Sequence, residues 1–255
     1  MRRCFYNSPL KNSKLVFRVY EFLFHSAYSR NDFIDVNLHG ANFLVPSKDV
    51  TILPGLLNNT FENELLTFLQ KYLQKGMIFV DVGANIGIHS SIAARCVGET
   101  GKIFCFEPVV ENYDLLLENV KKNIKCDPEK VFFHERIGIS NEKGTKQIFL
   151  EENSIGTHSM HAADSESKRS VEILTTTLDD YFGGAFKIDV LKIDIEGHEI
   201  PALVGAANTL LNTSLLLLEF DTKHFNQESK INQLLDMVKD FKHFYFFDEV
   251  GGGIN

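Results

Sequence analysis

The fold is decided by residues 77–87, which read MIFVDVGANIG. Residues 77–81 form a short apolar stretch that has the length and composition of a buried strand. Gly83 and Gly87 then allow the backbone to turn tightly and to approach a ligand closely. A helical pattern begins at about Ile86. The stretch therefore predicts a strand, a glycine-rich turn and a helix, the unit that begins a doubly wound α/β fold.

Short apolar stretches alternate with helical patterns along the rest of the chain. The expected strands are 77–81, 102–107, 131–133, 171–174, 189–194, 215–220 and 243–247. The expected helices are 58–74, 86–96, 108–124, 177–182, 199–211 and 227–241. Strands that are almost entirely apolar are buried on both faces, which indicates a Rossmann-like, mainly parallel sheet with helices on both faces. Residues 136–150 are interpreted as an excursion from this pattern, and residues 151–170 as a mobile polar loop.

Acidic side chains stand at the ends of four expected strands. They are Asp81, Glu107, Asp194 and Glu219. Ligands of open α/β sheets bind beyond the carboxyl ends of the strands, near the point where the strand order reverses. We therefore expect these four acids to gather at one edge of the sheet and to mark the functional site.

The N-terminal part, residues 1–60, is expected to be an extension of a domain that spans residues 61–255. A helix is predicted over residues 1–30, and a hairpin within 33–53 that turns at the sequence HGAN, residues 39–42. Residues 1–30 carry six basic residues and one acid. They are interpreted as a solvated terminal helix, with peripheral contact to a membrane surface as the weaker alternative.

The composition narrows the class of protein. The net charge of −8 argues against a broad nucleic-acid interface. The four cysteines show neither paired metal spacing nor a disulfide-dense pattern, so a reducing, cytoplasmic compartment is expected. We find no secretory signal and no transmembrane segment, because the most apolar early stretch is short and is interrupted by Arg18 and Glu21.

The glycine turn favours one kind of nucleotide-like ligand. A dinucleotide site would read G-x-G-x-x-G and would place pyrophosphate at the helix N-terminus. Here the first charged residue is Asp81, which would repel pyrophosphate and suits a ligand with an amino group and a sulfonium. S-adenosylmethionine (SAM) has both. Glu107 can accept both ribose hydroxyls, a role that serves NAD and SAM alike.

The chain resembles the FkbM family of SAM-dependent methyltransferases from about Phe61 to Phe220. The resemblance rests on residues 61–64 (FENE), 79–87 (FVDVGANIG), 106–108 (FEP), Asn112, Asn119, 177–179 (TLD) and 191–199 (LKIDIEGHE). The last stretch is the most specific. The resemblance implies a seven-stranded sheet, SAM as the cofactor, and methyl transfer, often to a hydroxyl oxygen. The C-terminus departs from the pattern, since one strand is expected there where the family fold has a pair.

The resemblance and the geometry together assign the cofactor residues. The methionine part of SAM is expected to contact four residues of the turn, and the ribose is expected to contact Glu107. Glu62 is expected either to close over the methionine end or to be an acid favoured by the dipole of its own helix. The four turn residues are Asp81, Gly83, Asn85 and Gly87.

The expected catalytic residues are Asp194, Glu196 and His198, where the strand 189–194 meets its loop. An alcohol needs a base to take its proton, and His198 or Asp194 can serve. The D-x-E-x-H spacing also suits a divalent ion, although no metal is assigned. His198 could instead be a packed helix N-cap. His89 follows the glycine turn and could face the acceptor, but the favoured interpretation is ordinary helix surface.

Three other functions are weighed against transfer to a small-molecule or glycan-like hydroxyl. N-methylation on the same fold is disfavoured, because the usual tetrad Asn/Asp-Pro-Pro-Tyr/Phe is replaced by DIEG at residues 194–197. A non-catalytic SAM-binding or scaffolding module is a second alternative, since fold alone does not prove chemistry. A nicotinamide-dependent oxidoreductase is disfavoured by the turn.

Overall fold

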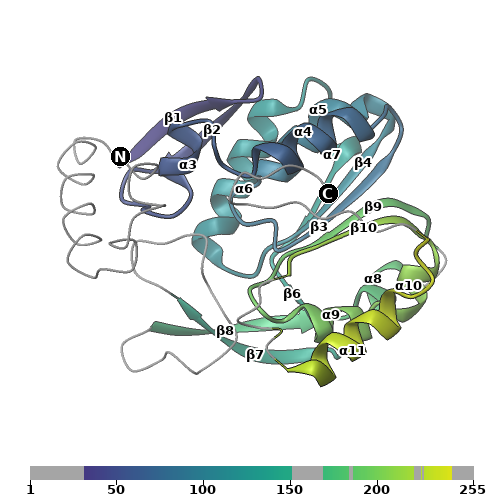
Figure 1. The fold of residues 1–255 in the computed structure, drawn as a ribbon. Coiled ribbons are helices and arrows are strands. Elements are labelled where there is room, and N and C mark those ends of the chain that lie inside the picture. The colour runs from purple at the N-terminus through teal and green to yellow at the C-terminus, as the bar shows by residue number, and fades with distance from the viewer. Residues whose placement is uncertain (1–31, 151–168, 184–185, 221–224, 226, 243–255) are drawn as a thin grey trace, which may run out of the picture.

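The computed structural model of the chain describes residues 32–150, 169–183, 186–220, 225 and 227–242. The expected helix over 1–30, most of the expected loop at 151–170 and the expected strand at 243–247 lie outside these residues. The central sheet of the described chain has five parallel strands in the order β10-β9-β3-β4-β5 (Figure 1). They are β3 (Ile78–Val82), β4 (Lys102–Phe106), β5 (Phe132–Glu135), β9 (Ile188–Ile193) and β10 (Thr213–Leu218). The predicted mainly parallel α/β sheet is confirmed.

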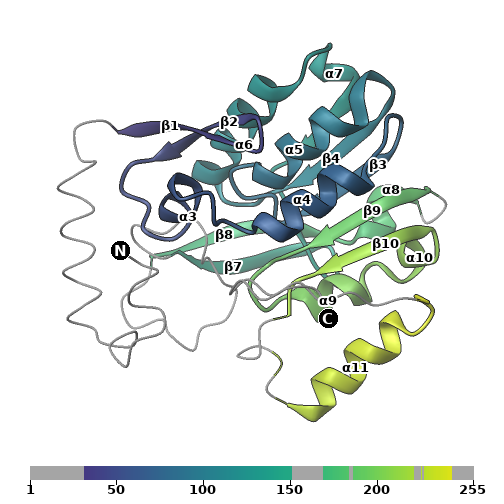
Figure 2. The same ribbon diagram turned by 45° about the horizontal axis from the view of Figure 1, so that its top comes forward.

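Helices cover both faces of this sheet (Figure 2). Alternate strand residues serve the two faces, so that Phe79 and Cys105 pack into one core while Val80 and Phe104 pack into the other. The first core lies under α4 (Asn63–Tyr72), α5 (Ile88–Val97) and α6 (Val110–Asn123). The second lies under α8 (Leu178–Phe182), α9 (Glu199–Val204), α10 (Ala207–Leu211) and α11 (Glu228–Val238). Burial on both sides explains why these strands are mostly apolar.

The strand order reverses between β3 and β9, because the chain adds β4 and β5 on one side of β3 and then β9 and β10 on the other. The carboxyl ends of β3, β4, β9 and β10 therefore meet around one crevice. The four strand-end acids belong to neighbouring strands of one sheet, as predicted.

A second sheet contains the excursion at 136–150. It has the order β6-β8-β7, with β6 (Gly138–Ile139), β7 (Gly144–Leu150) and β8 (Arg169–Thr176). The strand expected at 171–174 thus belongs to β8, and its assignment to the alternating parallel series was wrong. The reason is visible in its burial, which alternates over much of the strand because it pairs antiparallel with β7 and leaves one face exposed.

Two expected helices differ from the observed ones in their bounds. The segment expected at 199–211 breaks at Gly205, where a Cβ atom would overlap the carbonyl oxygen of Ser140. The segment expected at 58–74 contains only α4, and α3 (Leu53–Leu57) precedes it. Two further short elements are α7 (Pro128–Val131) and the 3₁₀ helix at Gly98–Thr100. None of the described helices is long and apolar enough to cross a membrane.

The predicted hairpin is formed by β1 (Phe33–Leu38) and β2 (Ala41–Pro46). It is fastened to α6 by two amide side chains. Asn119 accepts a hydrogen bond from the backbone N–H of Leu44 at 2.6 Å and donates to the carbonyl oxygens of Leu44 and Ile86. Asn123 bonds both backbone groups of Asn42. These bonds tie the hairpin to the glycine turn through α6.

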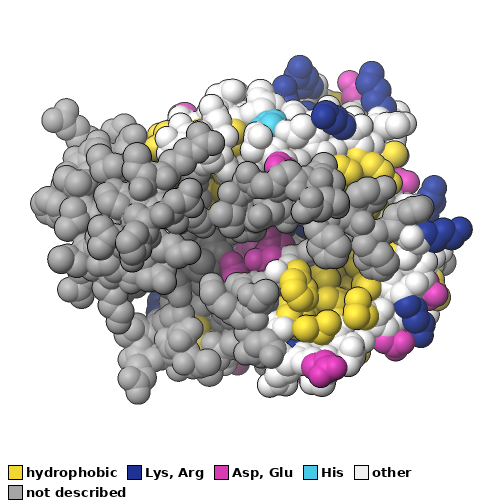
Figure 3. Space-filling model, viewed as in Figure 1, with side chains coloured by type: hydrophobic (Ala, Val, Ile, Leu, Met, Phe, Trp, Pro, Cys, Tyr) yellow, Lys and Arg dark blue, Asp and Glu magenta, His cyan; other side chains and the backbone are white. Residues whose placement is uncertain are grey.

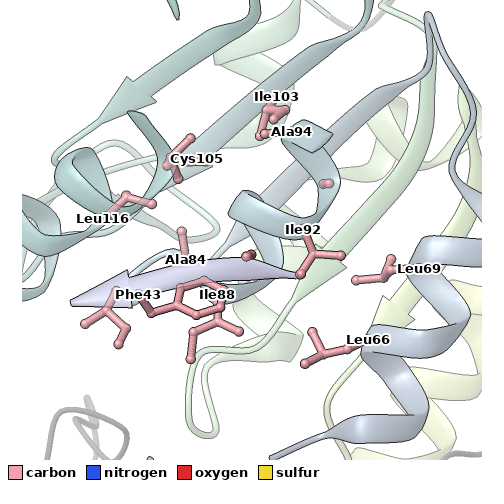
Figure 4. Close-up of a cluster of buried hydrophobic side chains, with 14 of the residues drawn as sticks. Phe43, Leu66, Leu69, Ala84, Ile88, Ile92, Ala94, Ile103, Cys105 and Leu116 are labelled. Atoms are coloured by element: carbon pink, nitrogen blue, oxygen red, sulfur yellow. The ribbon is translucent and has the colours of Figure 1, made fainter. Parts of the chain in front are cut away.

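The apolar side of the hairpin enters the first core. Phe43 is fully buried and lies close to Ala84 and Ile88 (Figure 4). The hairpin and the sheet thus share one cluster of buried side chains. The boundary at residue 60 between an extension and a SAM-binding domain stays a prediction.

Candidate active site

The glycine turn has three residues in the left-handed conformation, at every second position. Gly83, Asn85 and Gly87 have φ angles of 78°, 51° and 82°. The backbone N–H groups of Gly83 and Ala84 both donate to the carbonyl oxygen of Phe106, at 3.0 and 3.1 Å. The turn is thereby anchored to the end of β4. A Cβ atom on Gly83 would overlap the carbonyl oxygen of Asp194, so the turn also touches the end of β9.

Glu107 follows β4 and is almost completely buried. Its two carboxylate oxygens accept the backbone N–H groups of Asn85 and Val109, each at 2.9 Å. Burial raises the pKa of Glu107 to about 7, while the two N–H bonds oppose that rise. Each oxygen has a second lone pair, so the carboxylate can accept two further hydrogen bonds from a ligand.

A cavity opens at the carboxyl ends of the strands. Six predicted site residues line it, namely Glu62, Gly83, Asn85, Glu107, Asp194 and Glu196. In the view of Figure 3, acidic side chains group near the centre of the molecular surface. Ile137 and Gly138, which follow β5, also line the cavity. The structure therefore brings most of the predicted site to one surface.

Three predicted residues do not line this cavity: Asp81, Gly87 and His198. Asp81 is fully buried and accepts a 2.6 Å hydrogen bond from Ser90 Oγ. A Cβ atom on Gly87 would stand 2.8 Å from Leu116, so this glycine permits close packing of α5 against α6. The assignment of Asp81 and Gly87 to cofactor contacts stays a prediction.

His198 is buried at the N-cap of α9. Its Nε2 lies 2.9 Å from Ser140 Oγ. The ring is thus engaged with the strand region after β6, and its role as a base stays a prediction. Among the described residues no group of three or more His, Cys, Asp or Glu side chains could hold a metal ion, so the D-x-E-x-H residues do not form one.

Lys192 is a buried cation at the base of the site. It is 3% exposed, and its Nζ lies 3.0 Å from Asp194 Oδ2 and 3.5 Å from Asp81 Oδ1. The ammonium group holds the pKa of Asp194 below its usual range despite burial. Lys192 itself has a pKa raised by Asp194 and Asp81, against the effect of burial. One ammonium group therefore balances the buried carboxylate of Asp81 and the partly buried carboxylate of Asp194.

Glu219 follows β10 and lines the cavity beside Asp194. The two residues directly follow the paired Leu218 and Ile193, so their carboxyl groups are neighbours. Burial raises the pKa of Glu219 strongly, and the negative charges of Asp194 and Glu196 raise it further. A pair of carboxyl groups, of which Glu219 holds a proton more readily than Asp194, thus stands where the ends of β9 and β10 meet.

His89 forms the opposite side of the cavity. Its Nε2 lies 2.8 Å from Glu62 Oε2, and its side chain is only 8% exposed. The interpretation of His89 as ordinary helix surface was wrong. The reason is that α5 starts directly after the turn, so its first residues face the crevice and α4 instead of solvent.

Sequence reasoning missed Lys192 as part of the site, gave His89 a place beside the acceptor only as the weaker alternative, and noted Glu219 only as a strand-end acid. Lys192 carried a usable signal, because a lysine inside a mostly apolar strand must be paired when the strand is buried. The contact of His89 with Glu62 carried no such signal, since Glu62 lies 27 positions earlier in the chain.

The fold and the site together define a class of protein. A doubly wound parallel sheet, with a glycine turn after one strand and an acid after the next at the same edge, is the Rossmann-like sheet of class I methyltransferases. The family model for the methyltransferase FkbM domain matches residues 81–246. The chain belongs to this family.

Two curated relatives and one solved structure illustrate the likeness. The chain is 27% identical to the hexuronic acid methyltransferase AglP of Haloferax volcanii, with 62% of each chain covered. It is 28% identical to the methyltransferase sdnD of Sordaria araneosa, with 52% of this chain and 61% of that one covered. The crystal structure of the methyltransferase FkbM from Methylobacillus flagellatus KT is 17% identical, with 68% of this chain and 38% of that one covered and a TM-score of 0.45. The match spans less than two thirds of the length of each curated relative.

Proposed function

We propose that this chain binds SAM in the cavity at the strand ends and transfers its methyl group to a hydroxyl oxygen of a small-molecule or glycan-like acceptor. The observation that carries the proposal is that Gly83, Asn85 and Glu107 share one cavity with Asp194 and Glu219. Cofactor-type groups and proton-accepting groups thus face the same space.

The residues fit the cofactor by their chemistry. Glu107 offers a free lone pair on each carboxylate oxygen, which suits the two neighbouring hydroxyls of a ribose. The backbone of Gly83 and Asn85 stands at the cavity wall, and the acids around it suit a cationic ligand. SAM, when bound, supplies an electrophilic methyl group on a sulfonium. The protein's part is to orient that methyl and to remove the proton of the acceptor.

The acceptor class is supported by the relatives and by the loop after β9. AglP is named a hexuronic acid methyltransferase, which supports a glycan-like acceptor for this chain also. Residues 194–197 read DIEG and lack the proline-aromatic tetrad typical of N-methylation. Carboxylates of Asp194, Glu196 and Glu219 are available at that wall to accept a hydroxyl proton.

S-adenosylhomocysteine (SAH), the product of the cofactor, is expected to bind with micromolar affinity, and Glu107→Ala is expected to weaken it about 100-fold. The loss corresponds to one or two buried hydrogen bonds to a charged acceptor. Isothermal titration calorimetry of both proteins measures it. Glu129→Gln, an exposed glutamate in α7, is the control and should bind as the wild type does.

A circular dichroism melt must accompany the titration, because Glu107 also accepts two backbone N–H bonds. A folded wild type that does not bind SAH would refute the cofactor assignment and favour a scaffolding role. Labelled methyl transfer from SAM to a panel of neutral sugars, uronic acids and amines then tests the acceptor, and label found only on nitrogen would contradict O-methylation.

The affinity for SAH is expected to fall as the pH drops through about 7. Glu107 has a pKa raised to about 7 by burial, so below that pH the free protein carries it as a neutral acid that accepts hydrogen bonds poorly. The dissociation constant should rise about 10-fold between roughly pH 8 and 6. Glu107→Gln should show a flat profile over that range, and an equally steep profile in this variant would contradict the assignment.

A further inference from the structure

The carboxyl groups of Asp194 and Glu219 form a neighbouring pair in the cavity. They directly follow Ile193 and Leu218, which are paired in the adjacent strands β9 and β10, and both line the cavity. Two neighbouring carboxylates repel each other, so a state in which one of the two groups carries a proton is favoured.

The surroundings place that proton on Glu219. The Lys192 ammonium lies 3.0 Å from Asp194 Oδ2 and stabilises the ionised form of Asp194. Glu219 faces the charges of Asp194, Glu196 and Glu199, which all disfavour a second negative charge. Two further pairs of titratable groups lie near these acids. Asp81 is paired with Lys192, and Glu62 is paired with His89, which also lines the cavity.

We propose that Glu219 is the residue that takes the proton of the methyl acceptor. In this proposal, binding of the cationic cofactor first causes Glu219 to lose the proton that it carries in the free protein. The inference rests on the proposed function. A positive charge that enters the cavity favours the ionised state of nearby acids, so Glu219 gives its proton to solvent when SAM binds. SAH lacks the sulfonium charge and leaves the proton in place.

With Glu219 ionised, the proton, the electron pairs and the charge of the reaction are all accounted for. The O–H bond of the acceptor breaks and its proton goes to a Glu219 carboxylate oxygen. The freed electron pair of the acceptor oxygen forms the bond to the methyl carbon, while the C–S bond breaks and its electrons stay on sulfur. The positive charge disappears as Glu219 regains its proton, so the site returns to the state of the free protein. Asp194 is the weaker base of the two, because Lys192 lowers its pKa.

The test is calorimetric and needs no acceptor. SAM and SAH are titrated into the protein at about pH 8 in phosphate and in Tris, whose different ionisation enthalpies report the protons released. SAH is a matched control, since it shares every titrating group with SAM except the sulfonium charge. The wild type is expected to release about one proton more with SAM than with SAH. Glu219→Gln keeps the size of the side chain and an N–H donor to Asp194, and it should abolish the difference.

Further variants make the result specific. Asp194→Asn should reduce the difference, because it removes one of the negative charges that keep the proton on Glu219. His89→Gln and Glu129→Gln should retain it. Equal release by SAM and SAH in the wild type would overturn the inference while leaving the cofactor assignment intact, and this comparison stands even where a variant fails to fold. A difference that survives in Glu219→Gln but vanishes in His89→Gln would overturn it also. Absence of binding by either ligand would remove the inference together with the proposed function.

Discussion

Gly83→Ala should destabilise the protein by more than about 4 kcal/mol, the range that marks a severe backbone and packing defect. A Cβ atom at this position would overlap the carbonyl oxygen of Asp194 and stand 2.8 Å from Cγ2 of Ile195. Neither neighbour can retreat, because Asp194 bonds the carbonyl of Val82 through its own N–H and so is part of the parallel ladder. The φ angle of 78° adds strain for any residue with a side chain.

Thermal unfolding is the measurement, and a fall in Tm of roughly 10 °C or more is expected for a domain of this size. Gly183→Ala is the matched control, since Gly183 has a φ of 66° but no atom within 4 Å of its would-be Cβ. It should cost only about 1–2 kcal/mol from backbone strain. Equal losses in the two variants would mean that strain, and not contact between the turn and β9, makes glycine necessary.

Lys192→Met should cost about 3–5 kcal/mol of stability, as expected when one partner of a buried ion pair is removed. The ammonium group compensates Asp194 at 3.0 Å and the fully buried Asp81 at 3.5 Å. Methionine has a similar volume, so packing is largely kept and the loss reports the two uncompensated carboxylates. Chemical denaturation of wild type and variant measures the difference.

The deficit of Lys192→Met should shrink as the pH falls. In the wild type the pKa of Asp194 is lowered, so its contribution is present above the unfolded value and is lost as the pH falls through the folded pKa. In the variant burial raises the pKa of the acids, so stability is lost as the pH rises. Lys122→Met, at an exposed pair with Asp35, is the control and should cost at most about 1 kcal/mol. A pH-independent deficit would point to packing instead of charge.

Much of the sheet could be predicted from sequence because its determinants are local. Each buried strand is a short apolar run that an acid or polar loop terminates, so the ends of β3, β4, β9 and β10 could be placed within a few residues. The glycine turn was equally local. These features were enough to predict that Glu107 and Asp194 would meet at one edge.

The features of the fold and of the site that could not be predicted depend on residues that are distant from one another in the chain. The pairing of β7 with β8 could not be predicted, because the sequence of a strand alone does not determine which sheet it joins. The same holds for the orientation of His198 toward Ser140, 58 positions away. The contacts of Asp81 with Ser90 and Lys192 were not predicted either, and its contact with the cofactor stays a prediction. Direction of side chains at a strand end is set by tertiary packing.

The amide bonds from Asn119 and Asn123 to the hairpin have a kinetic consequence. They join residues 75 to 81 positions apart, so a long loop must close before they form. Such pairings slow folding, and during synthesis β2 leaves the ribosome well before α6 exists. Until α6 arrives, the hairpin lacks the helix that fastens it, and Phe43 and its apolar neighbours are covered only in part. The nascent hairpin is therefore a segment that is exposed to aggregation during synthesis.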